Sequence, residues 1–90
     1  MSKIVILKVI TGEEIIATKA DDGQYEKVRV FARGNDREGN PTVGLVPFIT
    51  LNQDAKISIN PSLIYCELEC PEPVEKSYLE VTSGFILAKG

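Results

Sequence analysis

The first twenty residues constrain the fold of this chain more than any other stretch. Two apolar runs, residues 4–10 and 13–20, flank Thr11 and Gly12. Because glycine tolerates the positive φ angles of tight turns, this pattern predicts a β-hairpin. The first run is apolar on both faces of a strand, with Val5, Leu7 and Val9 on one face and Ile4, Ile6 and Ile10 on the other. Such a strand is covered on both sides, so it lies inside a barrel or between a sheet and a second layer.

Four further extended segments follow, separated by turn residues. Residues 25–32 alternate in polarity and predict a third strand with one solvated face. Residues 43–51 predict a fourth strand that Pro47 interrupts, and proline favours a sheet edge or a bend because it cannot donate to a ladder. Residues 57–59 and 63–70 predict a short fifth strand and a last one. The side chains expected to be largely buried are Val5, Leu7, Val9, Ile16, Val28, Val30, Ile57 and Ile59.

The hydrophobic period changes in the last part of the chain. Val74, Tyr78 and Val81 recur at the spacing of one helix face. Acidic residues suit the first turn of such a helix, and Gly84 suits the position just past its end. The sequence therefore predicts a short C-terminal helix over about residues 73–83.

The short strands, with turn signals about every ten residues, predict an all-β fold, a small five-stranded barrel with a short C-terminal helix. The barrel is expected over about residues 3–70, and residues 1–90 form a single domain. No apolar run is long enough to cross a membrane, and the first residues lack the features of a signal peptide. We therefore expect a cytoplasmic protein with no membrane partner.

The composition argues against catalysis. The chain has no histidine, which removes the commonest general base and a favoured zinc ligand. It also lacks a recognisable nucleophile–base set and a glycine-rich phosphate loop. We expect a non-enzyme with no catalytic residue, metal ligand, cofactor or small-molecule substrate. Cys66 and Cys70 are too far apart along one strand for a disulfide, and we expect them to act as buried, small apolar residues.

One strand face carries Lys27, Arg29, Phe31 and Arg33. Arginine beside an aromatic residue is the combination that platforms for single-stranded nucleic acid use, through charge and stacking. The alternative is a solvated strand face whose aromatic residue packs under the helix. The net charge of −3 is unlike that of a strongly basic nucleic-acid binder. Both interpretations stay open on the sequence alone.

The late strands hold more apolar surface than one small barrel can cover. Exposed apolar patches mark interfaces, so we expect a homo-oligomer. The alternative is a monomer whose C-terminal helix covers the same surface. The interface residues expected in the oligomer are Leu45, Val46, Phe48, Ile49, Leu63, Ile64 and Leu68.

The order of these elements resembles the Sm-like (LSm) family of SH3-like barrels over about residues 3–70. A closer resemblance, carried by residues 43–48 and by the stretch from Tyr78 to Gly84, is to small Sm-like proteins of T4-type and marine phages. The residues that fit the first Sm motif are Leu7, Gly12, Ile15, Ala17, Val28 and Val30.

The resemblance implies a non-enzymatic, phage-linked protein in the host cytoplasm that forms a cyclic ring of five to seven subunits. In such a ring the fourth strand of one subunit pairs with the last strand of the next. It also implies RNA binding in phage RNA metabolism or regulation; the alternative is a structural or adaptor assembly protein without a nucleic-acid ligand. The family's base pocket is not carried over, because Lys27 stands at its asparagine position and residues 59–61 replace its second-motif Arg-Gly.

Overall fold

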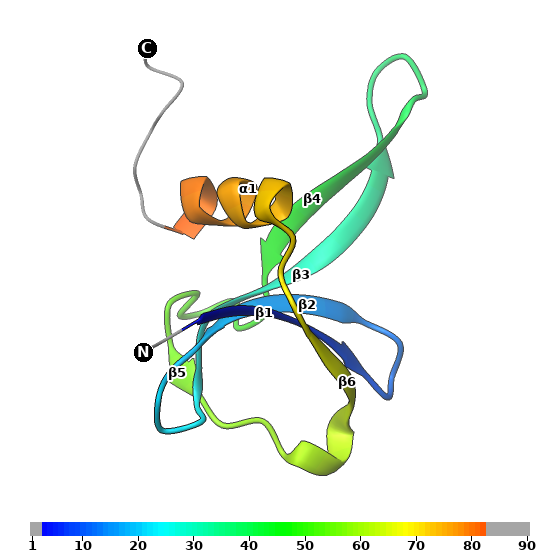
Figure 1. The fold of residues 1–90 in the computed structure, drawn as a ribbon. Coiled ribbons are helices and arrows are strands. Elements are labelled where there is room, and N and C mark those ends of the chain that lie inside the picture. The colour runs from blue at the N-terminus through cyan, green and yellow to red at the C-terminus, as the bar shows by residue number, and fades with distance from the viewer. Residues whose placement is uncertain (1–2, 83–90) are drawn as a thin grey trace.

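The computed structural model describes residues 3–82 (Figure 1). This part of the chain is mostly β, with one short α-helix after its last strand, as the sequence predicts. The elements are β1 (Lys3–Val9), β2 (Glu14–Lys19), β3 (Tyr25–Asn35), β4 (Pro41–Pro47), β5 (Lys56–Ile57), the 3-10 turn η1 (Pro61–Leu63), β6 (Ile64–Glu69) and α1 (Glu72–Thr82).

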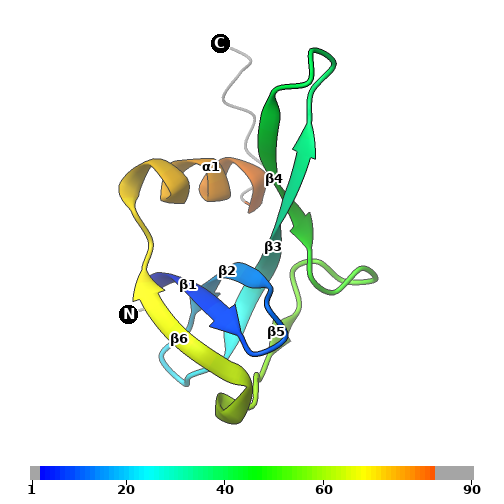
Figure 2. The same ribbon diagram turned by 90° about the vertical axis from the view of Figure 1, so that its right-hand side faces the viewer.

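All strand pairs are antiparallel, and the sheet runs in the order β4-β3-β2-β1-β6, with the two-residue β5 paired to β3. The predicted β1–β2 hairpin is present and pairs Leu7 with Ile15 and Ile6 with Ile16. Within residues 3–82 the sheet does not close, so the closed five-stranded barrel expected from the sequence is wrong. The eleven-residue β3 carries β4 out on an arm, away from β6 at the other end of the sheet (Figures 1 and 2).

The main core lies on one face of β1, β2 and β3. Its fully buried residues are Val5, Leu7, Ile15, Ala17, Tyr25 and Val28. The apolar residues that pack around it and are only partly buried are Val9, Val30, Ile57, Ile59 and Ile64. The expected burial is thus confirmed for Val5, Leu7 and Val28, and also for Ile16, which is buried outside this cluster. It is incomplete for Val9, Val30, Ile57 and Ile59, which lie at strand ends, beyond β5, or where β3 leaves the body of the domain.

The opposite face of β1 and β2 is also covered, as an apolar strand requires. Ile16 is fully buried there rather than in the main core. Thr18 lies two residues further along the same strand face, and its hydroxyl is 2.9 Å from the hydroxyl of Tyr78 in α1. The helix therefore packs across this face of the sheet, above β1 and β2 (Figure 1).

The buried stripe of α1 differs from the predicted one. Tyr78 and Thr82 are buried and Val74 is partly buried, whereas Val81 is half exposed. Thr82 tolerates burial because its hydroxyl donates a hydrogen bond to the Tyr78 carbonyl at 2.9 Å. The predicted end at Gly84 lies outside the described residues.

A β-bulge fixes the place where α1 contacts the sheet. Opposite Ile16 and Thr18, β3 carries one extra residue, and Lys27 there has a φ of 53°. This left-handed conformation costs a residue with a side chain about 1–2 kcal/mol. The Tyr78 hydroxyl donates to the Lys27 carbonyl at 3.0 Å, so α1 is bonded to the sheet at the bulge itself. Burial raises the pKa of Tyr78, so the phenol remains a donor.

Candidate functional site

The four residues predicted to bind RNA occupy different environments. Lys27 is partly buried at the bulge, and Phe31 is also partly buried. Arg33 is exposed on the arm, whereas Arg29 is only 2% exposed. Beyond the bulge, regular alternation keeps Arg29, Phe31 and Arg33 on one face, as predicted. Lys27 lies at the bulge and outside this alternation, so the predicted face of four residues is corrected to three. Only part of that face is open to a ligand.

The guanidinium of Arg29 holds the loop that follows β4. Its Nη1 donates to the Gln53 carbonyl at 2.5 Å, and its Nη2 donates to the Asp54 carboxylate at 3.3 Å. The expectation that Arg29 lies on a solvated strand face is thus corrected. The loop covers it, and a period-two pattern carries no information about a loop that returns from further along the chain.

A hollow at the β1–β2 turn brings Phe31 and Arg33 next to a cation that the sequence did not single out. This cation is Lys8 of β1, whose Nζ is 3.3 Å from the Glu14 carboxylate. The hairpin register could have predicted this pair, since Lys8 lies opposite Glu14. The cavity has a volume of about 330 Å³ and is lined by Lys8, Gly12, Glu13, Glu14, Phe31 and Arg33.

The outer edge of β4 has a defined hydrogen-bonding pattern. Phe48 donates its N–H to the Val28 carbonyl at 3.1 Å, so the residues that bond to β3 are the even-numbered ones. The backbone groups of Val43 and Leu45 therefore point away from the sheet. Pro41 and Pro47 occupy the same outward positions, where a missing N–H weakens no bond to β3.

The outer edge of β6 is open in the same way. Cys70 donates its N–H to the Ile4 carbonyl at 3.4 Å, and Leu68 lies opposite Ile6 in the same ladder. By alternation, the backbone groups of Glu67 and Glu69 point outward. Within residues 3–82, β4 and β6 each pair on one side only. Over these residues the sheet therefore ends in two unpaired edges.

Apolar side chains accompany both edges. Val43 on β4 is 63% exposed and Tyr65 on β6 is 77% exposed, and neither was among the expected interface residues. Of the expected ones, Leu45, Ile49 and Ile64 are partly buried, and the exposed members are Val46, Phe48, Leu63 and Leu68. This agrees with the expectation that an isolated chain leaves apolar surface uncovered.

Phe48 and Leu63 meet at an apolar hollow near one end of the sheet. Its volume is about 180 Å³, and its lining residues are Val9, Ile10, Thr11, Glu13, Ile15, Phe48, Ile59 and Leu63. The residue directly after β4 and the turn before β6 thus come together in space. Period-two alternation alone does not predict this contact.

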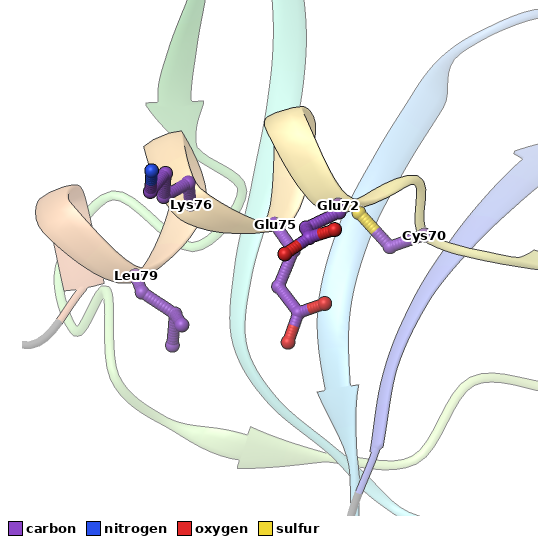
Figure 3. A pocket seen from close by; sticks show the side chains of 5 residues that line it. All are labelled: Cys70, Glu72, Glu75, Lys76 and Leu79. Carbon is purple, nitrogen blue, oxygen red and sulfur yellow. The ribbon is translucent and has the colours of Figure 1, made fainter.

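Both cysteines are free thiols, and their surroundings differ from the expected ones. Cys66 is exposed rather than buried, and Cys70 is partly buried. Burial, and next the Glu75 carboxylate, raise the pKa of Cys70, which keeps it a protonated, weak nucleophile. Cys70 lines a cavity of about 410 Å³ with Glu72, Glu75, Lys76 and Leu79 (Figure 3). Among the described residues, no group of three or more His, Cys, Asp or Glu could hold a metal ion.

Over residues 3–82, the geometry defines a small antiparallel β-sheet with two open edges and a short helix on one face. No family model matches the chain, and comparison with curated proteins gives no match. Within the described part of the chain, no helix is sufficiently long and apolar to span a bilayer.

Proposed function

We propose that this chain is an Sm-like protein of the phage type, and that it assembles into a closed ring by pairing its two open sheet edges. The observation that supports this function is the position of β4 and β6 at opposite ends of one sheet, each with outward backbone groups. Its place of action, as the resemblance implies, is the host cytoplasm.

Unpaired edges are templates for strand addition, and pairing β4 of one copy with β6 of the next satisfies both edges. The two edges are different surfaces of the same chain, so the contact is head-to-tail. Such contacts generate cyclic rings when the rotation closes. The ring size of five to seven subunits comes from the family resemblance.

The local structure at the motif residues supports the Sm-like assignment. Leu7 and Ile15 are buried opposite each other in the first hairpin, and Gly12 has the positive φ of 104° that its turn requires. Val28 closes the same core from β3. These residues are the ones that fit the first Sm motif.

Blocking one edge with proline is expected to convert the ring into smaller species. Val43→Pro removes an N–H that points away from β3, so the fold keeps its ladder while the partner strand loses a donor. Sedimentation of the parent should give a mass of about 50–70 kDa, five to seven times the 9.9 kDa of one chain. The variant should sediment near the mass of one chain.

Val43→Thr, which keeps the N–H and a β-branched side chain, is the matched control and should retain the parent mass. Glu69→Pro blocks the other edge and should give the same result as Val43→Pro if the first variant misfolds. A parent that sediments as a monomer, or as a two-fold dimer, would contradict the proposal.

A second candidate function is binding of single-stranded RNA, and the cavity shared by Lys8, Phe31 and Arg33 favours it. Affinity should be weak and should fall with salt. If two phosphates are neutralised, the logarithm of the binding constant should fall by about 1.4 for each tenfold increase in salt concentration. Lys8→Gln with Arg33→Gln should abolish this binding, measured by anisotropy of a labelled ten-nucleotide RNA. Lys76→Gln, on the helix, is the control. Without binding by the parent at low salt, the ring is a structural or adaptor assembly.

A further inference from the structure

Arg29 is a buried cation whose hydrogen bonding is incomplete. Its side chain is 2% exposed, and its two Nη groups donate to the Gln53 carbonyl and the Asp54 carboxylate. Within residues 3–82 its Nε, which is also buried, has no hydrogen-bond partner. Buried N–H groups nearly always have an acceptor, and leaving one without an acceptor is costly. The guanidinium therefore has a donor to spare.

The spare donor lies beside one that is only partly used. In a guanidinium, the Nε–H and the nearer Nη2–H point the same way and form a fork that fits two oxygens of one anion. Asp54 occupies one arm of this fork, because its Oδ1 is 3.3 Å from Nη2. The Asp54 side chain is also 57% exposed. An oxyanion that engages both arms makes one bond more than Asp54 makes.

The loop that supplies Asp54 is loosely attached to the body of the domain. None of residues 48–55 is buried, and only Ile49 and Ala55 are partly buried. None of them belongs to the main core. Segments with few buried apolar contacts open locally at a low cost in free energy. Displacing residues 49–54 from Arg29 therefore sacrifices little apolar contact.

Arg29 continues the strand face that reaches the candidate RNA cavity. β3 pairs regularly with β4 over this stretch, so Arg29, Phe31 and Arg33 lie on one face. Phe31 and Arg33 line the cavity next to Lys8. The two arginine Cα atoms are about 13 Å apart, four residues at the rise of a strand. Cations on both sides of an aromatic ring suit a single strand, whose phosphates and bases alternate.

We propose that Arg29 binds a phosphate of single-stranded RNA, and that residues 49–54 cover it until the phosphate displaces Asp54. The inference rests on the RNA binding given above as the second candidate function, and it adds a binding residue and its regulation. In the closed form, the Gln53 carbonyl and the Asp54 carboxylate stand in for phosphate oxygens. Affinity for RNA is reduced by the fraction of molecules in which Arg29 is covered.

Removing the competing carboxylate tests the proposal. Asp54→Asn should raise the affinity for a labelled ten-nucleotide RNA by about three- to tenfold, because a neutral amide holds Arg29 less strongly. Glu38→Gln is the matched control, since it removes one acidic charge at an exposed position on the arm. The control should change the affinity by less than about twofold, because salt screens distant charges. Combining Arg29→Gln with Asp54→Asn should cancel the gain.

Hydrogen exchange keeps the test decisive if the buried Arg29→Gln variant does not fold. Saturating the parent with the same RNA at low salt should speed amide exchange in residues 49–54, because the loop leaves Arg29. The amides of β1 and β2 should keep their rates. Simple contact between RNA and a closed loop would slow exchange there instead.

The outcomes separate the Arg29 site from RNA binding itself. RNA binding that depends on Lys8 and Arg33, with no greater effect of Asp54→Asn than of Glu38→Gln, overturns the Arg29 site and leaves the RNA-binding function standing. Loop exchange that is unchanged or slower in the complex overturns the Arg29 site as well. A parent that binds no RNA at low salt overturns the RNA-binding function and, with it, the site.

Discussion

Leu7→Ala is expected to lower the free energy of unfolding by about 2–5 kcal/mol, the range for deletion of a buried leucine side chain. Leu7 is fully buried at the centre of the main core, between β2 and β6. Domains have total free energies of unfolding of only about 5–15 kcal/mol. The expected loss is therefore a large share of the total, and it is enough to unfold a domain at the low end of that range. Urea unfolding at a fixed protein concentration measures the change.

Leu51→Ala is the control, because Leu51 is 98% exposed and its removal should change stability by less than about 0.5 kcal/mol. A Leu7→Ala variant that unfolds at the parent's urea concentration would show that β1 has a different register.

Tyr78→Ala is expected to destabilise the fold by about 3–5 kcal/mol, by analogy with other buried aromatic side chains. Tyr78 is fully buried and forms the main contact between α1 and the sheet. Tyr78→Phe should lose about 1–3 kcal/mol, because the Lys27 carbonyl is left without its donor. Tyr65→Phe, at an exposed tyrosine, should be nearly neutral.

The pH dependence gives a separate readout of the Tyr78 hydroxyl. Burial raises the pKa of Tyr78 above the unfolded value, so the folded state binds the phenolic proton more tightly. The protonated phenol makes its whole contribution to the free energy of unfolding below about pH 10, the pKa of tyrosine in the unfolded chain. This contribution is lost as pH rises through the higher pKa of the folded state. Burial also raises the pKa of Tyr25, so the loss is measured as the difference between the parent and Tyr78→Phe. Equal alkaline losses in both proteins would contradict this role.

The hairpin, the strand segments and the C-terminal helix could be predicted because local alternation and spacing determine them. Which β3 side chains face the main core could be predicted only for the residues beyond the bulge. Tyr25 and Val28 are three residues apart, yet both enter the main core, since the extra residue at Lys27 shifts the alternation. A lysine in a left-handed conformation has no sequence signature, so strict alternation could not place Tyr25 inside.

Less of the candidate site could be predicted. The burial of Arg29 depends on Gln53 and Asp54, which a loop brings back from more than twenty positions away. The meeting of Lys8 with Phe31 depends on how β1, β2 and β3 lie side by side. Closure of the barrel failed as a prediction because it depends on where the long β3 carries β4, which apolar alternation does not specify.

The two prolines of β4 also limit how a partner strand can be positioned. Of its four outward-facing residues, Pro41 and Pro47 offer no N–H, and only Val43 and Leu45 can donate. If a partner strand slides by two residues along this edge, it meets a proline of β4 in place of one of the two β4 residues that can donate. The edge is consequently a short window with one favoured alignment, and it resists the open-ended stacking that longer bare edges permit.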